Sequence, residues 1–497
     1  MTGASRAPER LVGFDTLGEV FIEDGRVFRG IYPGSGAHVR ELLERCARAN
    51  VFSAGVIPTQ AVEDPRPELG YELVLEHERV PFVNYPHEWP ASMLRDAALF
   101  HTQLFLDLAE HGLTLKDWHP YNVLFDGAAP RFVDFTSLLP HEGILDVDYL
   151  QGPRASGGFR RGWDDYAERY YRMYRLTFEP FFAMPLIMMS RGEHRDAHRR
   201  LFETALNSAD EWITRGEAFS GHRLARLGYE LFDRRLRIAL AEPGPVKRRF
   251  FEVVLGWIEG LDVALTGSHY SSYYEEKNEA FSMEPSPEWT DKQQAVHDAL
   301  AQLRPQTVLD FGSNTGWFSV LAARMKSSVV AIDVDEASIE GLYRSAKMSS
   351  LPILSLVVNL ADPPADVAPR FFENEPPLSR IGGNAPLYPA PQKRLACEMV
   401  MALAIVHHLA LGQGLSFVQI ASVFEQLGSK YLCAEFVALD DPLVKGEPDF
   451  FPAYYRAMDG FGWYTLENFT TELRRYYSSV EIRKSHPENR VMVVCSR

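Results

Sequence analysis

Residues 307 to 323, TVLDFGSNTGWFSVLAA, combine a short apolar strand, a turn with two glycines and the start of a helix. Gly312 and Gly316 lack a Cβ, so the turn can approach a ligand closely, and the following helix offers free N–H groups. Twenty-three residues after Asp310, Asp333 ends the next apolar segment. A carboxylate at the tip of a neighbouring strand can bind both ribose hydroxyls, so this pattern predicts a nucleoside site.

A second stretch, residues 115 to 138, reads LKDWHPYNVLFDGAAPRFVDFTSL. Asp117 and Asn122 are five positions apart, and Asp134 follows twelve positions later, across an apolar hairpin that would bring it back beside Asn122. The spacing resembles that of protein kinases and aminoglycoside phosphotransferases. In these enzymes one aspartate orients the acceptor hydroxyl, while the asparagine and the second aspartate hold metal ions. The resemblance implies Mg²⁺ and ATP as cofactors if this region is active.

Two parts of a phosphotransferase site are missing from the sequence. The glycines of GIYPGSGAH, residues 30 to 38, lack the strand-turn-strand frame of a phosphate loop, and no strand lysine has an acidic partner in the helix that follows. Arg29 could replace that lysine, although its guanidinium is a different donor. Phe135-Thr136 also replaces the Phe-Gly that usually follows the metal-binding aspartate in these enzymes. A kinase-like fold without kinase activity is therefore the favoured interpretation, and an active kinase remains the alternative.

The surrounding elements divide the chain into three predicted parts. Residues 1–150 form a kinase-like α+β domain with a hairpin at Asp24-Gly25, and a long helix ends near Gly112. Residues 151–285 form a helical connector or lower lobe. In residues 286–497, apolar strands alternate with helices, which predicts a mostly parallel sheet whose last two strands are antiparallel.

Composition limits the classes of function. A chain of 497 residues exceeds what one hydrophobic core supports, and the formal charge of −16 argues against nucleic acid as the partner. The four cysteines are far apart and lack a CxxC pair, so no metal site or disulfide framework is predicted. No segment has the length and apolarity of a signal peptide or a membrane span, so we expect a cytoplasmic protein.

The motif D-x-G-x-x-x-G, with Asp333 in the ribose position, resembles that of class I S-adenosylmethionine-dependent methyltransferases. The resemblance implies a Rossmann-like, seven-stranded α/β domain that binds S-adenosylmethionine. An incidental glycine turn in another α/β domain is the alternative. The predicted cofactor-binding residues are Asp310, Gly312, Ser313, Asn314, Gly316, Asp333, Asn359 and Asp362. For the last two, which would contact adenine, a plain turn at Asp362-Pro363 is an equal alternative.

Two residues are candidates for catalysis at the carboxyl edge of this sheet. His407 lies in MALAIVHHLAL after the fourth strand and could act as general base, but only one of His407 and His408 can face the site, and packing is the alternative. Glu435 ends the fifth strand, where capping or solvation is equally consistent. The intervening segment 360–395, with eight prolines, is predicted to form a lid over the acceptor.

From about residue 75 on, the chain resembles a bacterial group of two-part methyltransferases related to the nodulation protein NoeA, which pairs a kinase-like region with a class I domain. The resemblance implies methylation of oxygen or nitrogen on a small-molecule or saccharide acceptor, with the kinase-like region shaping the acceptor site. The alternative is a bifunctional kinase-methyltransferase, similar in kind to bifunctional enzymes that cap O-antigen chains. The sequence gives no indication of the oligomeric state.

Overall fold

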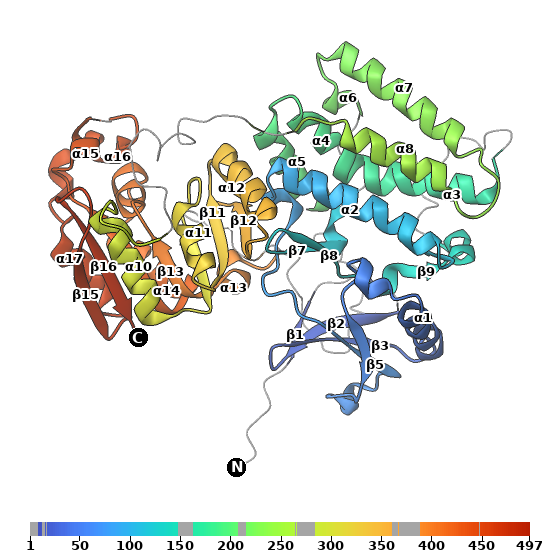
Figure 1. Ribbon diagram of the computed structural model, residues 1–497, viewed down its shortest axis with the longest axis horizontal. Coiled ribbons are helices and arrows are strands. Elements are labelled where there is room, and N and C mark those ends of the chain that lie inside the picture. Colours follow the sequence, from blue (N-terminus) through green and yellow to red (C-terminus); the bar gives the residue numbers. More distant parts are fainter. Residues whose placement is uncertain are drawn as a thin grey trace.

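The structure is a computed structural model of the 497-residue chain. It describes residues 8–11, 15, 17–147, 163–206, 215–263, 265, 284–359, 366, 388–446 and 448–497. Asp362 and most of the predicted lid lie outside these residues. Figure 1 shows an N-terminal part built of a small sheet and a helical lobe, with a C-terminal sheet and its helices beside that lobe.

The N-terminal sheet has five antiparallel strands in the order β1-β2-β3-β5-β4, with one helix between β3 and β4. Asp24 and Gly25 form the predicted two-residue hairpin and both have positive φ, 49° and 78°. The elements are β1 (Glu9–Arg10), β2 (Gly18–Glu23), β3 (Arg26–Ile31), α1 (Gly36–Arg48), β4 (Thr59–Val62) and β5 (Leu73–His77).

The second motif lies on two short antiparallel strand pairs between this sheet and the helical lobe (Figure 1). Helix α2 (Ala91–Ala109) leads into β6 (Leu113–Leu115), which pairs with β9 (Leu138–Pro140). The helix ends three residues before Gly112, whose φ of 67° turns the chain into β6. Between β6 and β9, strands β7 (Val123–Asp126) and β8 (Ala129–Phe132) form the hairpin that the sequence predicts.

Helices of the middle region complete this lobe by packing around α2 and the motif. Trp118 illustrates the packing: its ring lies 4.4 Å from that of Phe178, 5.1 Å from Phe105 and 5.3 Å from Phe251. The helices are α3 (Asp165–Met173), a π-helix (Tyr174–Ala183), α4 (Met184–Met189), α5 (His194–Leu206), α6 (Arg215–Ala218), α7 (Arg223–Ala239) and α8 (Arg248–Glu259). None of the helices in the described residues is long and apolar enough to cross a membrane.

The C-terminal sheet has seven strands in the order β12-β11-β10-β13-β14-β16-β15. Its strands are parallel except β16, which runs antiparallel to both neighbours. This order, with one reversed strand, is that of the Rossmann-like class I methyltransferase fold, so the predicted fold class is confirmed. The strands are β10 (Thr307–Phe311), β11 (Ser328–Asp333), β12 (Ile353–Val357), β13 (Cys397–Ala402), β14 (Gly428–Val437), β15 (Ser479–Lys484) and β16 (Arg490–Ser496).

Helices cover both faces of this sheet. On one face α10 (Asp291–Leu303) packs on β14, β15 and β16, and α11 (Trp317–Arg324) packs on β10, β11 and β12. Helix α12 (Glu336–Met348) lies between the sheet and the N-terminal part (Figure 1). The remaining helices are α13 (Pro391–Arg394), a π-helix (His408–Gly412), α14 (Phe417–Leu427), α15 (Pro442–Gly446), α16 (Pro452–Arg456) and α17 (Leu466–Leu473). All four cysteines are buried free thiols.

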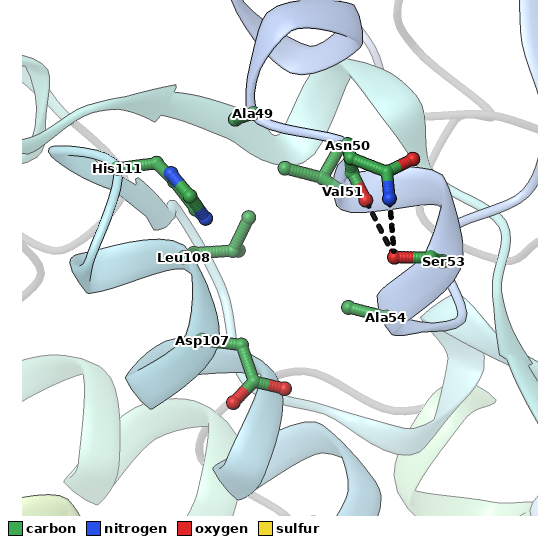
Figure 2. A pocket seen from close by; sticks show the side chains of 8 residues that line it. All are labelled: Ala49, Asn50, Val51, Ser53, Ala54, Asp107, Leu108 and His111. Carbon is green, nitrogen blue, oxygen red and sulfur yellow. Dashed lines mark hydrogen bonds between the residues drawn. The ribbon is translucent and has the colours of Figure 1, made fainter.

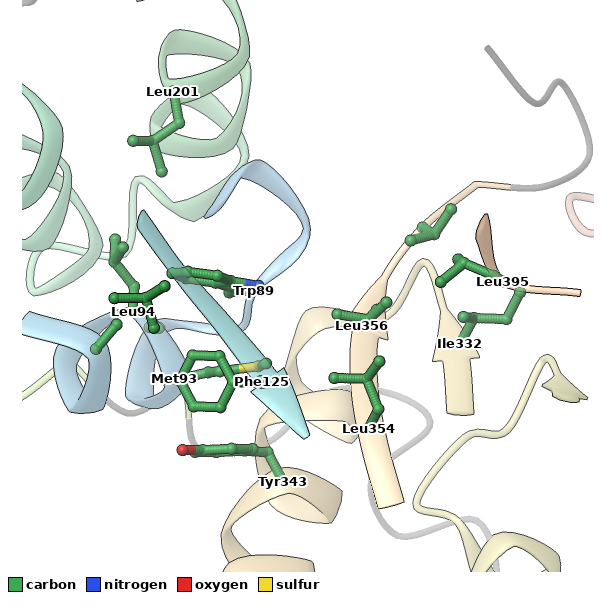
Figure 3. Packing of buried hydrophobic residues seen from close by; sticks show 14 of the residues in the cluster. Trp89, Met93, Leu94, Phe125, Leu201, Ile332, Tyr343, Leu354, Leu356 and Leu395 are labelled. Atoms are coloured by element: carbon green, nitrogen blue, oxygen red, sulfur yellow. The ribbon is translucent and has the colours of Figure 1, made fainter. Parts of the chain in front are cut away.

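The two parts share one hydrophobic core and several polar contacts. Figure 3 shows Trp89, Met93 and Phe125 on one side and Tyr343 and Leu354 on the other. The rings of Phe125 and Tyr343 are 6.2 Å apart in an edge-to-face arrangement. The C-terminal domain is thus packed against the kinase-like lobe through α12 and the edge strand β12.

Polar groups fix the register of this contact. Ser92, at the start of α2, bonds through its amide and hydroxyl to the Glu340 carboxylate of α12. One α2 turn further on, Asp96 Oδ2 accepts from Tyr343 Oη and Lys347 Nζ, both at 2.6 Å. The three α12 residues are spaced along one helix face, so the first turns of α2 lie along α12.

Candidate functional site

The glycine loop between β10 and α11 requires its glycines for both conformation and packing. Gly312, Asn314 and Gly316 have φ of 77°, 52° and 82°, a region that side chains other than asparagine rarely adopt. A Cβ at Gly316 would overlap Leu342 of α12, and one at Gly312 would lie 3.1 Å from Ile405. The loop is therefore held tightly between α12 and the segment after β13, at the carboxyl edge of the sheet.

Asp333 closes this loop from the neighbouring strand. Its Oδ2 accepts from the Asn314 amide at 2.8 Å, and its Oδ1 accepts from the Asp335 amide at 3.0 Å. Burial raises the pKa of Asp333, and these backbone N–H groups oppose that shift. Each carboxylate oxygen keeps a second lone pair, so the group can accept two further hydrogen bonds from vicinal hydroxyls.

Asp310 lies beneath the loop. It is buried, and its Oδ2 accepts from Ser319 Oγ of α11 at 2.6 Å. Burial raises the pKa of Asp310 to about 6, and the Ser319 hydroxyl lowers it. The hydrogen bond links β10 to α11 under the loop, so Asp310 helps to position the loop. Direct contact between Asp310 and a cofactor remains a prediction.

Two buried polar atoms of the loop have no hydrogen-bond partner among the residues that the structure describes. They are Ser313 Oγ and Trp317 Nε1. A buried polar group left without a partner costs about 1–3 kcal/mol, so such atoms at one loop are consistent with a polar ligand there. Exposed Asn359 follows β12 at the same edge of the sheet, whereas its predicted companion Asp362 falls outside the described residues.

The two adjacent histidines after β13 differ in burial. His407, the predicted general base, is fully buried and its ring lies 5.5 Å from that of Phe451. His408 is partly exposed at the start of the π-helix, and burial followed by the charge of Arg490 lowers its pKa to about 4. His408 is therefore neutral at physiological pH, and it is the more exposed ring of the two. The sequence pattern of adjacent histidines could not distinguish them.

Glu435 is fully enclosed. Its Oε2 accepts from Lys292 Nζ of α10 at 2.9 Å, and its Oε1 accepts from Ser485 Oγ at 2.5 Å. Lys292 Nζ also lies 5.5 Å from the Phe318 ring centre. Both carboxylate oxygens thus have partners inside the domain, which favours a structural role over the predicted catalytic one. Nothing in the local sequence signalled Lys292, a charged residue on the buried side of α10.

The three residues of the kinase-like motif do come together. Ser137 Oγ lies 3.0 Å from Asp117 Oδ2 and 2.7 Å from Asp134 Oδ2, and Asn122 Nδ2 donates to Asp117 Oδ1 at 2.5 Å. Ser137 was not predicted, although it follows the motif aspartate by three positions. The hairpin thus places the motif side chains as the spacing predicts, with a serine between the two aspartates.

Arg29 of β3 enters this cluster. Its Nη1 donates to Asp15 Oδ2 and Thr136 Oγ1, both at 2.6 Å, and its Nη2 donates to Asp134 Oδ1 at 2.9 Å. Burial alone would raise the pKa of Asp134, but Arg29 and then Lys116 outweigh it and lower this pKa to about 2. The carboxylate that would hold metal in a phosphotransferase is therefore already paired with a guanidinium.

The position of Asp15 is also unfavourable for a nucleotide. This residue lies between β1 and β2, where phosphotransferases of the kinase class place their glycine-rich phosphate loop. Its carboxylate points to Arg29 and would repel phosphates there. Within the described chain, no cluster of three or more histidine, cysteine, aspartate or glutamate side chains has the geometry of a metal site.

The kinase-like motif also contacts the C-terminal domain. Tyr121 Oη lies 3.3 Å from Tyr388 Oη, at the end of the proline-rich segment that precedes β13. Six residues on, Arg394 forms a buried bidentate ion pair with Glu88 and stacks over Tyr85 at 4.9 Å. The N-terminal region therefore anchors the segment that leads back into the sheet.

A small hollow is present elsewhere, between the end of α2 and residues 49–54 (Figure 2). Figure 2 shows Asp107 and His111 on one side and the Asn50 and Ser53 side chains, hydrogen-bonded at 3.0 Å, on the other. It lies in neither the nucleoside loop nor the kinase-like cluster and has no arrangement that suggests chemistry.

No family model matches the chain. It is 24% identical over 478 residues to nodulation protein NoeA of Rhizobium meliloti (strain 1021), and the alignment covers 91% of each protein. The chain is a homologue of that protein. The match extends through both parts of the structure, as the sequence resemblance implies.

Solved structures that are similar to parts of the chain include two methyltransferases. One is the bifunctional kinase-methyltransferase WbdD, with 14% identity, a TM-score of 0.29 and coverage of 45% of this chain and 42% of that one. The other is magnesium protoporphyrin IX methyltransferase from Synechocystis PCC 6803, with 12% identity, a TM-score of 0.29 and coverage of 46% and 96%. The match thus spans less than half of WbdD. At TM-scores below 0.5 neither similarity bears on the activity of this chain.

Proposed function

We propose that the protein is an S-adenosylmethionine-dependent methyltransferase acting on oxygen or nitrogen of a small-molecule or glycan acceptor. The observation that carries this proposal is the loop Gly312–Gly316, fixed to the Asp333 carboxylate at the carboxyl edge of a class I sheet. Asp333 would hold the ribose, and the loop with Ser313 and Trp317 would hold the amino-acid end of the cofactor. Bound S-adenosylmethionine supplies an activated methyl group.

The chain's own contribution to transfer is mostly alignment. Holding the acceptor atom in line with the methyl group converts a bimolecular reaction into one between fixed partners. His408, neutral and partly exposed at the same edge, is placed to take the acceptor's proton. The kinase-like region would shape the acceptor side, because its Tyr121 and Glu88 contact the segment leading into β13.

The test is transfer of labelled methyl from S-adenosylmethionine to a low-molecular-weight extract, followed by mass analysis of the labelled product. The wild type should label a discrete compound, and His408→Ala should reduce the rate about 100-fold or more if the histidine is the base. S-Adenosylhomocysteine affinity, measured by calorimetry, should be unchanged in that variant. The proposed function is refuted if the wild type neither binds S-adenosylhomocysteine nor labels a product.

A bifunctional kinase-methyltransferase is the second candidate, supported by the assembled Asp117, Asn122 and Asp134 cluster. The Arg29 pairs with Asp15 and Asp134 argue against it, because a nucleotide would have to displace them. We therefore expect no heat of binding with millimolar Mg²⁺-ATP, under conditions in which S-adenosylhomocysteine gives a clear signal on the same sample. Magnesium-dependent ATP binding that Asp134→Asn abolishes would instead establish the bifunctional enzyme.

A further inference from the structure

Helix α7 has a second apolar side that nothing in the described chain covers. Leu224, Leu227, Leu231 and Ile238 are 85%, 52%, 55% and 61% exposed. They are four of the eight large hydrophobic side chains that are strongly exposed among the described residues. The other four are scattered singly over the C-terminal domain, where isolated exposure is ordinary.

These four residues form a stripe along the helix. At about 100° per residue they fall within roughly 60° of the helix circumference. The buried apolar residues of α7 lie on a different side, which packs against the lobe: Tyr229, Phe232, Leu236 and Ala239. An amphipathic surface helix needs only one apolar side to fold onto its domain, so the outer stripe has no use in the packing of this lobe.

The position of α7 makes the stripe accessible. Figure 1 shows this helix at the outer edge of the helical lobe, and α8 packs against both α7 and α2. Residues 221–228 are exposed on every side, so the amino-terminal half of α7 projects from the lobe. A projecting helix can touch a broad, flat surface, whereas a groove-binding partner would have to enclose it.

Basic side chains border the stripe. Arg223, Arg234 and Arg235 are exposed and form no ion pair with any described residue, whereas Arg226 pairs with Glu230 on the helix itself. This basic border stands on a chain whose formal charge is −16. An apolar stripe with arginines on its sides is the pattern of helices that lie in the interface of an anionic bilayer.

We propose that α7 docks the protein on an anionic lipid surface, with the four apolar residues inserted among the acyl chains and the arginines against the headgroup phosphates. A second copy of the chain is a poorer occupant, because an antiparallel α7 pair would bring the two arginine borders together. The inference does not depend on the proposed methyltransferase activity, since it concerns a different helix and a different ligand.

Vesicle sedimentation with the full chain tests this proposal. Wild type should bind vesicles of phosphatidylcholine mixed with phosphatidylglycerol and bind pure phosphatidylcholine much less. Arg234→Gln with Arg235→Gln should weaken the anionic binding about five-fold per arginine. The triple variant Leu224→Gln, Leu227→Gln and Leu231→Gln should reduce it by about tenfold per leucine.

A matched control replaces exposed hydrophobic residues elsewhere, with Met348→Gln, Val418→Gln and Ile482→Gln, and should bind as wild type does. Thermal unfolding should be unchanged in both triple variants because all six side chains are exposed. The proposal is overturned if wild type does not bind anionic vesicles, or if the control loses binding equally. Self-association that the α7 variant abolishes, without vesicle binding by wild type, would overturn it in favour of a second copy.

Discussion

Replacing Asp333 with alanine is expected to weaken S-adenosylhomocysteine binding by about 100-fold or more. The carboxylate offers charged acceptors to the two ribose hydroxyls, and hydrogen bonds to charged groups contribute about 1.5–3 kcal/mol each. The substitution also removes the acceptor of the Asn314 and Asp335 amides, so the glycine loop loses its attachment to β11. Calorimetry with S-adenosylhomocysteine measures the change directly.

Two further variants separate recognition from folding. Asp335→Asn lies two residues on, where the side chain accepts from Ser338 Oγ at 2.6 Å at the start of α12, and should leave the cofactor affinity unchanged. Asp333→Asn keeps the size of the group but loses its charge and should fall between wild type and alanine. Equal affinity in wild type and Asp333→Ala would remove Asp333 from the site.

Most of the C-terminal fold was predictable because its signals are local. Six of the seven strands are mainly apolar, whereas the edge strand β15 alternates polar and apolar residues, and α11 begins at Trp317, directly after the glycine turn as predicted. The glycine loop was equally predictable, because a positive φ and a close approach to α12 both require glycine at position 316. The antiparallel pairing of β15 and β16 followed from the short link between them.

Side-chain partners across the fold were less predictable. Sequence spacing brought Asp117, Asn122 and Asp134 together, but it could not show that Arg29, more than a hundred positions from Asp134, pairs with that aspartate. The same holds for Lys292 and Glu435, and for the choice between His407 and His408, because burial is decided by elements distant in the chain. The domain boundaries and the predicted lid remain predictions.

The contacts between the two parts support our proposal that the kinase-like region shapes the acceptor site without a nucleotide. Arg29 pairs with Asp134, the carboxylate that would hold metal in a phosphotransferase, and Tyr121 of the kinase-like motif contacts Tyr388 before β13. A motif suited to holding an acceptor hydroxyl thus lies in one packed unit with the methyltransferase fold. Losing the phosphate site while keeping the acceptor loop would turn a kinase lobe into an acceptor-binding module, which is how we interpret it.

Replacing Arg29 with methionine is expected to lower the free energy of unfolding by about 3–5 kcal/mol near neutral pH, because it removes the guanidinium from the mostly buried carboxylates of Asp15 and Asp134 and leaves them with the more distant Lys116. The measurement is urea unfolding. The matched control is Arg26→Met on the same strand, whose ion pair with Glu76 is exposed and should contribute little.

The pH dependence of this loss gives a second test. In the wild type the pKa of Asp134 is lowered to about 2 from its usual value near 4, so its pairing stabilises the fold above about pH 4 and is lost as the pH falls from there towards 2. In Arg29→Met the guanidinium no longer opposes the effect of burial, so the pKa of Asp134 should rise above its usual value. The variant protein can then fold with Asp134 protonated. The stability difference between wild type and Arg29→Met should therefore shrink as the pH falls from the raised pKa of Asp134 in the variant towards about 2. If Arg29→Met instead loses only as much unfolding free energy as Arg26→Met, at every pH, the cluster of Arg29, Asp15 and Asp134 is open to solvent. The Arg29 ion pairs would then no longer argue against nucleotide binding.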